Sequence, residues 1–107
     1  MKHLPLILVA GAALAPAAVA ADEHDAGRQL AYTCTGCHGI AGQKNVYPHY
    51  HVPKIAGQSR DYLVAALTAY RKGERTHPTM RAQGEGLSAA EIDQVAAYLA
   101  SLAEAAQ

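Results

Sequence analysis

The sequence contains no tryptophan and no phenylalanine, so tyrosine is the only large aromatic side chain available to fill a core. It has only two cysteines, Cys34 and Cys37, which leaves no second pair to complete a zinc site. No segment alternates apolar and polar residues as a strand does, which argues against a thioredoxin-like redox unit. The absence of a dense basic run gives no support to nucleic-acid binding. Because tryptophan and phenylalanine are absent, something other than large aromatic side chains must occupy the centre of this domain.

Residues 1–20 have the pattern of a signal peptide that is removed on export. Lys2 and His3 give a short positive start, and an uncharged apolar stretch leads to the cleavage pattern Ala18-Val19-Ala20. That stretch is short for a bilayer span and is interrupted by proline and glycine, so a membrane anchor is the weaker interpretation. No cysteine lies near the cleavage point to carry a lipid. We therefore expect export, with a mature chain that begins at Ala21.

Residues 21–107 are then expected to form one small domain. A chain of this length buries a limited apolar core and usually depends on a cross-link or a cofactor. Helical periodicity predicts three main helices, at residues 22–37, at residues 59–72 with Ser59 as N-cap, and from the capping box Ser88-Ala89-Ala90-Glu91 onward. The expected apolar stripes are Leu63, Ala66, Leu67 and Tyr70 on the second helix and Ile92, Val95, Ala96, Leu99 and Leu102 on the third. The segments between them, residues 39–58 and 74–87, are rich in Gly, Pro and His and are expected to be loops. The predicted fold class is all-α.

The most informative stretch is Cys34-Thr35-Gly36-Cys37-His38. Two thiols three residues apart, with a histidine directly after the second, have the spacing of covalent c-type haem attachment. The thiols of Cys34 and Cys37 can each add to one haem vinyl group, and His38 then lies under the iron as the proximal axial ligand. A simple disulfide is the alternative for an exported chain with two cysteines. The predicted cofactor is one covalent haem c, with the three helices wrapped around it.

A haem iron in an electron carrier usually has a second axial ligand, and Met80 is the prediction for it. Met1 leaves with the signal peptide, which makes Met80 the only methionine of the mature chain. It lies in a segment expected to be a polar loop, where no helical stripe would make it a core-filling residue. The alternative ligands are three loop histidines, namely His49, His51 and His77.

Together these residues resemble a class I c-type cytochrome, most closely the bacterial monohaem proteins similar to one domain of cytochrome c4 or to cytochrome c553. The resemblance covers essentially the whole mature chain. Its motifs are Cys34-Thr35-Gly36-Cys37-His38-Gly39, Pro53-Lys54-Ile55-Ala56-Gly57-Gln58, Tyr62-Leu63, Pro78-Thr79-Met80 and Val95-Ala96-Ala97-Tyr98-Leu99.

The resemblance implies two contacts in the folded chain. Pro53 would present its carbonyl oxygen to the ring N–H of His38, which orients the imidazole toward the iron. The first and last helices would cross at four residues, namely Gly27, Leu30, Val95 and Tyr98. One segment departs from the family, because Gln43 to Val52 is longer than in its smallest members.

The mature chain is nearly balanced in charge, but its charges are unevenly distributed. Seven basic residues and only two acidic ones lie between Lys44 and Arg81. The basic ones are Lys44, Lys54, Arg60, Arg71, Lys72, Arg75 and Arg81. This predicts a basic surface near the haem edge that steers an acidic redox partner, the alternative being an ordinary solvated surface.

The leading hypothesis is a soluble electron carrier of the bacterial periplasm, which moves single electrons between redox proteins and is not itself an enzyme. The alternative is a haem subunit that stays bound to one periplasmic dehydrogenase. A third class, a gas sensor or a haem peroxidase, would need a sixth iron position that is open or easily vacated. No stable membrane insertion is expected once the signal peptide is removed.

Overall fold

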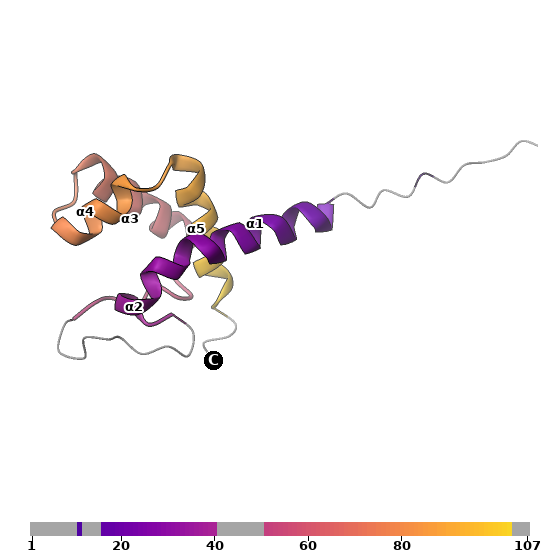
Figure 1. The fold of residues 1–107 in the computed structure, drawn as a ribbon, viewed down its shortest axis with the longest axis horizontal. Helices are drawn as coiled ribbons and strands as arrows, with labels where there is room; N and C mark the ends of the chain where they lie inside the picture. Colours follow the sequence, from indigo (N-terminus) through magenta and orange to yellow (C-terminus); the bar gives the residue numbers. More distant parts are fainter. Residues whose placement is uncertain (1–10, 12–15, 41–50, 104–107) are drawn as a thin grey trace, which may run out of the picture.

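The computed structural model describes residue 11, residues 16–40 and residues 51–103. Within these ranges the regular structure is helical, without a strand, so the predicted all-α class is confirmed. The elements are α1 (Pro16–Ala31), the 3-10 helix η1 (Tyr32–Cys34), α2 (Thr35–His38), α3 (Arg60–Lys72), α4 (Pro78–Glu85) and α5 (Ala89–Ser101). Figure 1 shows α3 and α4 side by side at one end of the helical domain and α2 at the end of α1. His49 and Tyr50 lie outside the described residues.

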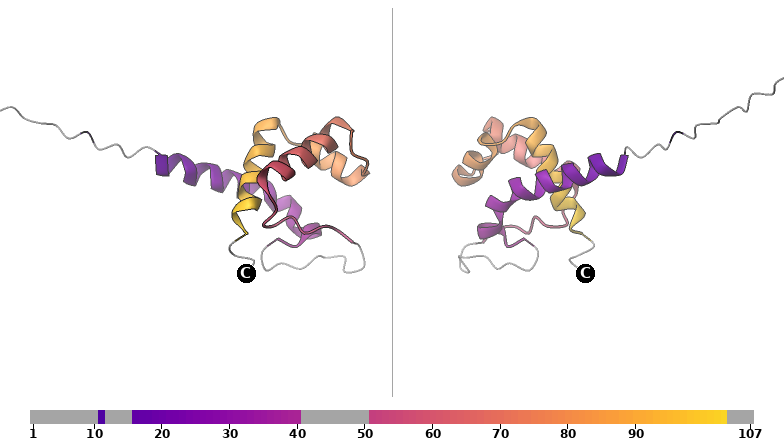
Figure 2. Two further views of the ribbon diagram at one scale, coloured as in Figure 1. Left: turned by 180° about the vertical axis from the view of Figure 1, so that it is seen from behind. Right: turned by 45° about the vertical axis from the view of Figure 1, so that its right-hand side comes forward.

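The first and last helices cross at a glycine, as the resemblance implies (Figure 2). A Cβ atom on Gly27 would overlap the carbonyl oxygen of Gln94 and would lie 2.8 Å from the Cβ of Tyr98. Leu30 and Tyr98 are half-buried and pack against the core beside this crossing. The missing side chain of Gly27 is therefore what lets α1 lie directly on α5.

The core is formed where α5 meets α1 and α3. Its buried members are Ala31, Ile40, Leu63, Val95, Ala96 and Leu99. The predicted apolar stripes supply Leu63 and the three α5 residues, which confirms the period-3.6 interpretation of both helices. The segment before α3 is tied to this core because the Gly57 N–H donates to the Leu99 carbonyl at 2.9 Å.

The starts of α3 and α5 follow the predicted capping signals. The Ser59 hydroxyl accepts from the Tyr62 N–H at 3.1 Å at the start of α3. At the start of α5 the Ser88 hydroxyl accepts from the Glu91 N–H at 3.1 Å, and the Glu91 carboxylate accepts from the Ser88 N–H at 2.8 Å. The capping box predicted from the sequence is therefore confirmed.

The first helix differs from its prediction at both ends. It begins at Pro16 and ends at Ala31, and the chain continues through η1 and α2 instead of one helix to residue 37. The cause is local: the Thr33 hydroxyl donates to the Leu30 carbonyl at 3.3 Å, and the Thr35 hydroxyl donates to the Tyr32 carbonyl at 2.7 Å. Such side-chain bonds compete with the helical ladder and tighten the chain here. Removal of residues 1–20 stays a prediction.

The segment predicted as a loop at residues 74–87 contains a helix, α4, and that part of the prediction was wrong. The start signal is Pro78 in the first turn, preceded by His77, whose ring nitrogen accepts from the Met80 N–H at 3.3 Å. The glycines at positions 84 and 86 obscured the helical pattern, because glycine is a poor helix former. Packing of α4 on α3 compensates for this weak propensity.

Candidate functional site

The two cysteines and the histidine of the motif are gathered by the tight turn after α1. Cys34 ends η1 and is half-buried, Cys37 lies in α2 and is exposed, and His38 is the last residue of α2. Both thiols are free. Burial raises the pKa of the Cys34 thiol, an effect that the Thr33 hydrogen bond partly offsets.

The imidazole of His38 is held by a residue fifteen positions further along the chain. Its Nδ1 lies 2.8 Å from the carbonyl oxygen of Pro53. A carbonyl oxygen can only accept, so the shared hydrogen is on Nδ1 and the neutral ring keeps an unprotonated Nε2. Nε2 is therefore the atom of His38 that is able to bind a metal ion.

Met80 is placed by a helix rather than by the loop predicted for it. It is half-buried in the first turn of α4, and its backbone N–H is held by His77. The helix α3, against which α4 packs, thus determines where the thioether of Met80 lies.

Two cavities, of about 380 and 230 Å³, lie beside these residues. Four residues line both cavities, namely Cys37, His38, Thr79 and Met80. The predicted proximal and distal ligands, His38 and Met80, therefore line the same two cavities, which together are called the hollow below. Pro53 lines the smaller cavity and Cys34 the larger one.

The larger cavity has apolar walls and no charged residue among those that line it. Its main apolar residues are Leu30, Ile55, Leu63, Leu67, Leu87, Val95 and Leu99. The smaller cavity is bordered instead by hydroxyl and cationic groups, among them Tyr62, Tyr70, Arg75 and Lys54. The apolar walls and the two thiols of the larger cavity suit a flat macrocycle that carries vinyl groups. The hydroxyl and cationic groups of the smaller cavity suit its carboxylate groups. The residues present thus fit a haem.

Sequence reasoning did not single out the cluster at the rim of the smaller cavity. The guanidinium of Arg75 lies 4.9 Å from the centroid of the Tyr70 ring and donates to the Tyr62 hydroxyl at 3.4 Å. The hydrogen bond to Tyr62 is the main cause that raises the pKa of Arg75, which therefore stays charged. The sequence signals were the four-residue spacing of the two tyrosines with Ala66 along α3 and the place of Arg75 among the basic residues between Lys44 and Arg81.

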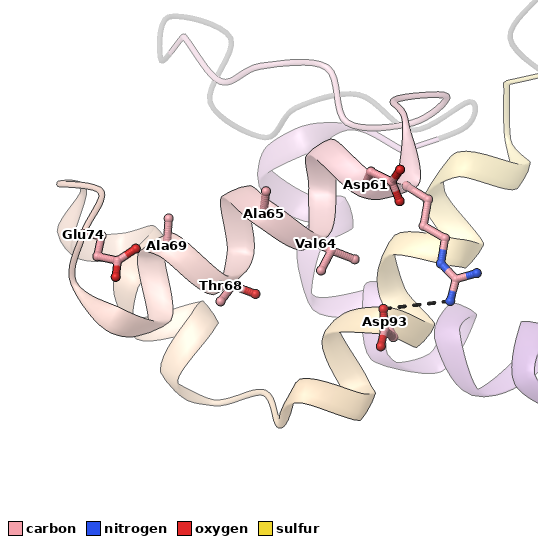
Figure 3. Close-up of a pocket in the computed structure, with 8 residues that line it drawn as sticks. Asp61, Val64, Ala65, Thr68, Ala69, Glu74 and Asp93 are labelled. Carbon is pink, nitrogen blue, oxygen red and sulfur yellow. Dashed lines mark ion pairs between the residues drawn. The ribbon is translucent and has the colours of Figure 1, made fainter.

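A third hollow, of about 550 Å³, lies on α3 and contains none of the predicted site residues (Figure 3). It is lined by Asp61, Glu74 and Asp93 together with small side chains and Arg60. Arg60 lies 3.9 Å from Asp93 of α5, an exposed ion pair that contributes little stability. Arg60 therefore belongs to a mixed-charge surface and not to the rim of the His38–Met80 hollow.

The comparisons with known proteins agree with this geometry. A family model for cytochrome c matches residues 24–103. The chain belongs to the cytochrome c family. Its cofactor is accordingly a covalent haem c and its function is electron transfer.

Several curated cytochromes are similar to the chain. It is 32% identical over 106 residues to the "Cytochrome subunit of sulfide dehydrogenase" of Chlorobaculum tepidum, covering 94% of this chain and 93% of that protein. It is 39% identical over 79 residues to "Cytochrome c-554(548)" of Halomonas halodenitrificans, covering 71% of this chain and 92% of the relative. It is 34% identical over 101 residues to cytochrome c4 of Pseudomonas aeruginosa, covering 94% of this chain but 49% of the relative. These relatives are electron-carrier cytochromes, and one is named as a subunit of a dehydrogenase.

Proposed function

We propose that the protein is an exported single-electron carrier whose one haem is held by Cys34, Cys37, His38 and Met80. The observation that carries this proposal is the hollow that His38 and Met80 line together, with Cys37 on both of its cavities. When bound, a haem iron supplies a one-electron couple between its ferric and ferrous states. The chain's own residues do the rest: they attach the group, orient the ligands and exclude water through apolar walls.

The attachment needs no oxidant. Each thiol of Cys34 and Cys37 would add across a vinyl double bond, with sulfur bonded to one carbon and the thiol hydrogen transferred to the other. His38 would offer Nε2 to the iron, because its Nδ1–H is directed at the Pro53 carbonyl. The neutral thioether of Met80 would favour ferrous iron and raise the reduction potential relative to a second imidazole.

Covalent attachment is tested by the behaviour of the denatured holoprotein. Wild-type protein is expected to keep its haem colour on a denaturing gel, and Cys37→Ala is expected to mature poorly or not at all. Haem that passes freely from the wild-type protein into acidified organic solvent would falsify the thioether assignment.

The distal ligand is tested by optical spectroscopy of the ferric protein. The wild type is expected to show the weak far-red charge-transfer band of sulfur-ligated haem. Met80→Ala is expected to erase that band, lower the reduction potential and open the iron to carbon monoxide or cyanide. Since His77 is three residues away and could replace the sulfur, Met80→Ala/His77→Ala separates loss of the thioether from histidine capture. A wild-type protein without the band, which binds carbon monoxide readily, would contradict ligation by Met80 and favour the sensor or peroxidase class.

Cleavage after Ala20 and location in the bacterial periplasm are part of the proposal. No helix in the described ranges has the length and hydropathy needed to cross a bilayer. Mass spectrometry of the purified holoprotein is expected to give a first residue of Ala21, and osmotic-shock fractionation is expected to release the haem protein with the periplasmic contents. An uncleaved chain in the membrane fraction would contradict both.

A second candidate function is that of a haem subunit bound to one periplasmic dehydrogenase. It is favoured by the similarity to a cytochrome subunit of sulfide dehydrogenase, which extends over nearly the full length of both chains. Gel filtration of a native extract distinguishes the two roles. A free carrier elutes as a small monomer, whereas a subunit elutes in a larger complex with a second protein.

The partner surface is proposed to be basic. Lys54 and Arg75 are exposed and line the smaller cavity, and Arg71 and Lys72 are exposed in the last turn of α3, which supports it. Partner association is expected to slow as the Debye length falls from about 30 to about 10 Å. Arg71→Glu is expected to slow association without a spectral change, while Arg60→Glu, on the mixed-charge hollow of Figure 3, is the matched control. A rate indifferent to salt and to both variants would leave only an ordinary solvated surface.

A further inference from the structure

The helix that carries Met80, α4, packs on α3 and lines the larger cavity. Its buried residue is Gly84, and Met80 is half-buried. Met80 and Gly84 are four residues apart, so they lie one above the other on the same face of the helix. The rise of about 1.5 Å per residue places them about 6 Å apart along the helix axis.

Gly84 lies against the backbone of α3. A Cβ atom at this position would be 3.0 Å from the Arg71 nitrogen, 3.1 Å from the Leu67 carbonyl oxygen and 3.3 Å from the Arg71 Cα. These neighbours are main-chain atoms of a hydrogen-bonded helix, which cannot turn aside as a flexible side chain does. A methyl group at position 84 is therefore expected to move α4 away from α3 by a few tenths of an ångström.

We infer that Gly84 is a positioning residue for Met80. By letting α4 lie directly on α3, it sets the depth to which the thioether reaches into the hollow it shares with His38. The inference rests on the proposed role of Met80 as distal ligand. A thioether is a neutral, weakly held ligand, so the strength of its bond to iron depends on the protein holding the sulfur in place.

The test compares Gly84→Ala with Glu85→Ala in the holoprotein. Glu85 is the control because it is the next residue of α4, is exposed and lines neither cavity. Gly84→Ala is expected to weaken the far-red band, lower the reduction potential and raise the affinity for imidazole at least tenfold. Glu85→Ala is expected to leave all three at their wild-type values.

A double-mutant cycle separates positioning from general destabilisation. In a Met80→Ala background there is no sulfur to displace, so Gly84→Ala is expected to leave imidazole affinity unchanged. If Gly84→Ala matures as holoprotein only in that background, the inference is also supported. If it fails to mature in either background, its role is merely structural and the inference is overturned.

Two other outcomes also overturn the inference. The first leaves the assignment of Met80 as ligand intact, and the second overturns that assignment as well. If the wild type has the far-red band and Gly84→Ala keeps the band, the potential and the imidazole affinity, Gly84 positions nothing, even if the variant unfolds more easily. If the wild type itself lacks the band, the assignment of Met80 as ligand fails first and the inference fails with it.

Discussion

In the described part of the chain, the α1–α5 and α3–α4 helix crossings are both made at a glycine, and they have different roles. At the α1–α5 crossing Gly27 faces Gln94 and Tyr98, and α5 also carries most of the buried core. At the α3–α4 crossing Gly84 faces the backbone of α3, and α4 carries the half-buried Met80. The first crossing therefore contributes to the core of the domain, whereas the second positions one short helix and the proposed ligand on it.

The largest expected effect is on the first crossing. Gly27→Ala puts a methyl group into the Gln94 carbonyl and against Tyr98, so it is expected to lower the free energy of unfolding by about 3 kcal/mol. Urea unfolding of the holoprotein measures this, with Gly86→Ala as a control for adding a methyl group. The far-red band at low urea is expected to keep its wild-type intensity. Loss of the band before unfolding would show that the two crossings are not separate in function.

A smaller effect on the free energy of unfolding is expected at the start of α5, the helix that α1 crosses. Ser88→Ala removes the hydroxyl that accepts from the Glu91 N–H and is expected to cost about 1 kcal/mol of global stability. Ser88→Asp, which can also accept at a helix start, serves as the control and is expected to restore most of it. An unchanged urea midpoint in Ser88→Ala would mean that packing alone stabilises α5 and that the Ser88 cap contributes nothing.

The corresponding cap on α4 is expected to act locally. His77→Ala removes the ring nitrogen that accepts from the Met80 N–H and is expected to weaken α4 by somewhat less than about 1 kcal/mol. The effect is expected as a fewfold rise in imidazole affinity with little change in the global urea midpoint. His77→Asn keeps an acceptor at this position and is expected to behave as the wild type. A fall in global stability as large as that of Ser88→Ala would remove the contrast between the two regions.

The smallest effect is expected on the outer surface of α4. Arg81 donates to Glu85 at 2.8 Å, an exposed pair four residues apart with the cation on the N-terminal side, which is the less favourable order. Arg81→Gln is therefore expected to cost no more than about 0.3 kcal/mol and to leave the far-red band intact. A clear loss of the band would show that this surface pair, and not the contact at Gly84 alone, holds α4 in place.

The sequence predicted the helices that carry strong local signals. The capping box at Ser88 and the Ser59 cap marked the starts of α5 and α3, and their apolar spacing identified Leu63 and Leu99 as core. It missed α4 because Gly84 in its last turn and Gly86 directly after it weaken the helical pattern, and that helix depends on its contact with α3. It also extended the first helix through Thr33, whose hydroxyl bonds to the backbone and helps to break the helix there.

For the site, the motif alone named Cys34, Cys37 and His38, because the chemistry needs those residue types within one turn of chain. Met80 could be named because residues 21–107 contain a single thioether. The cluster of Tyr62, Tyr70 and Arg75 could not be predicted, because their common position at the rim of the smaller cavity depends on how α3 and the chain after it fold.

By itself the sequence determined the haem attachment pattern, the identity of the helices with strong caps, and the family to which the chain belongs. These properties depend on short motifs whose residues are close together along the chain, so local chemistry decides them. Only the tertiary structure decided that the Pro53 carbonyl meets Nδ1 of His38, that Met80 and His38 share one hollow, and that Gly84 sits on the backbone of α3. These are contacts between segments distant in sequence, and they arise only when the apolar faces of α1, α3 and α5 pack together.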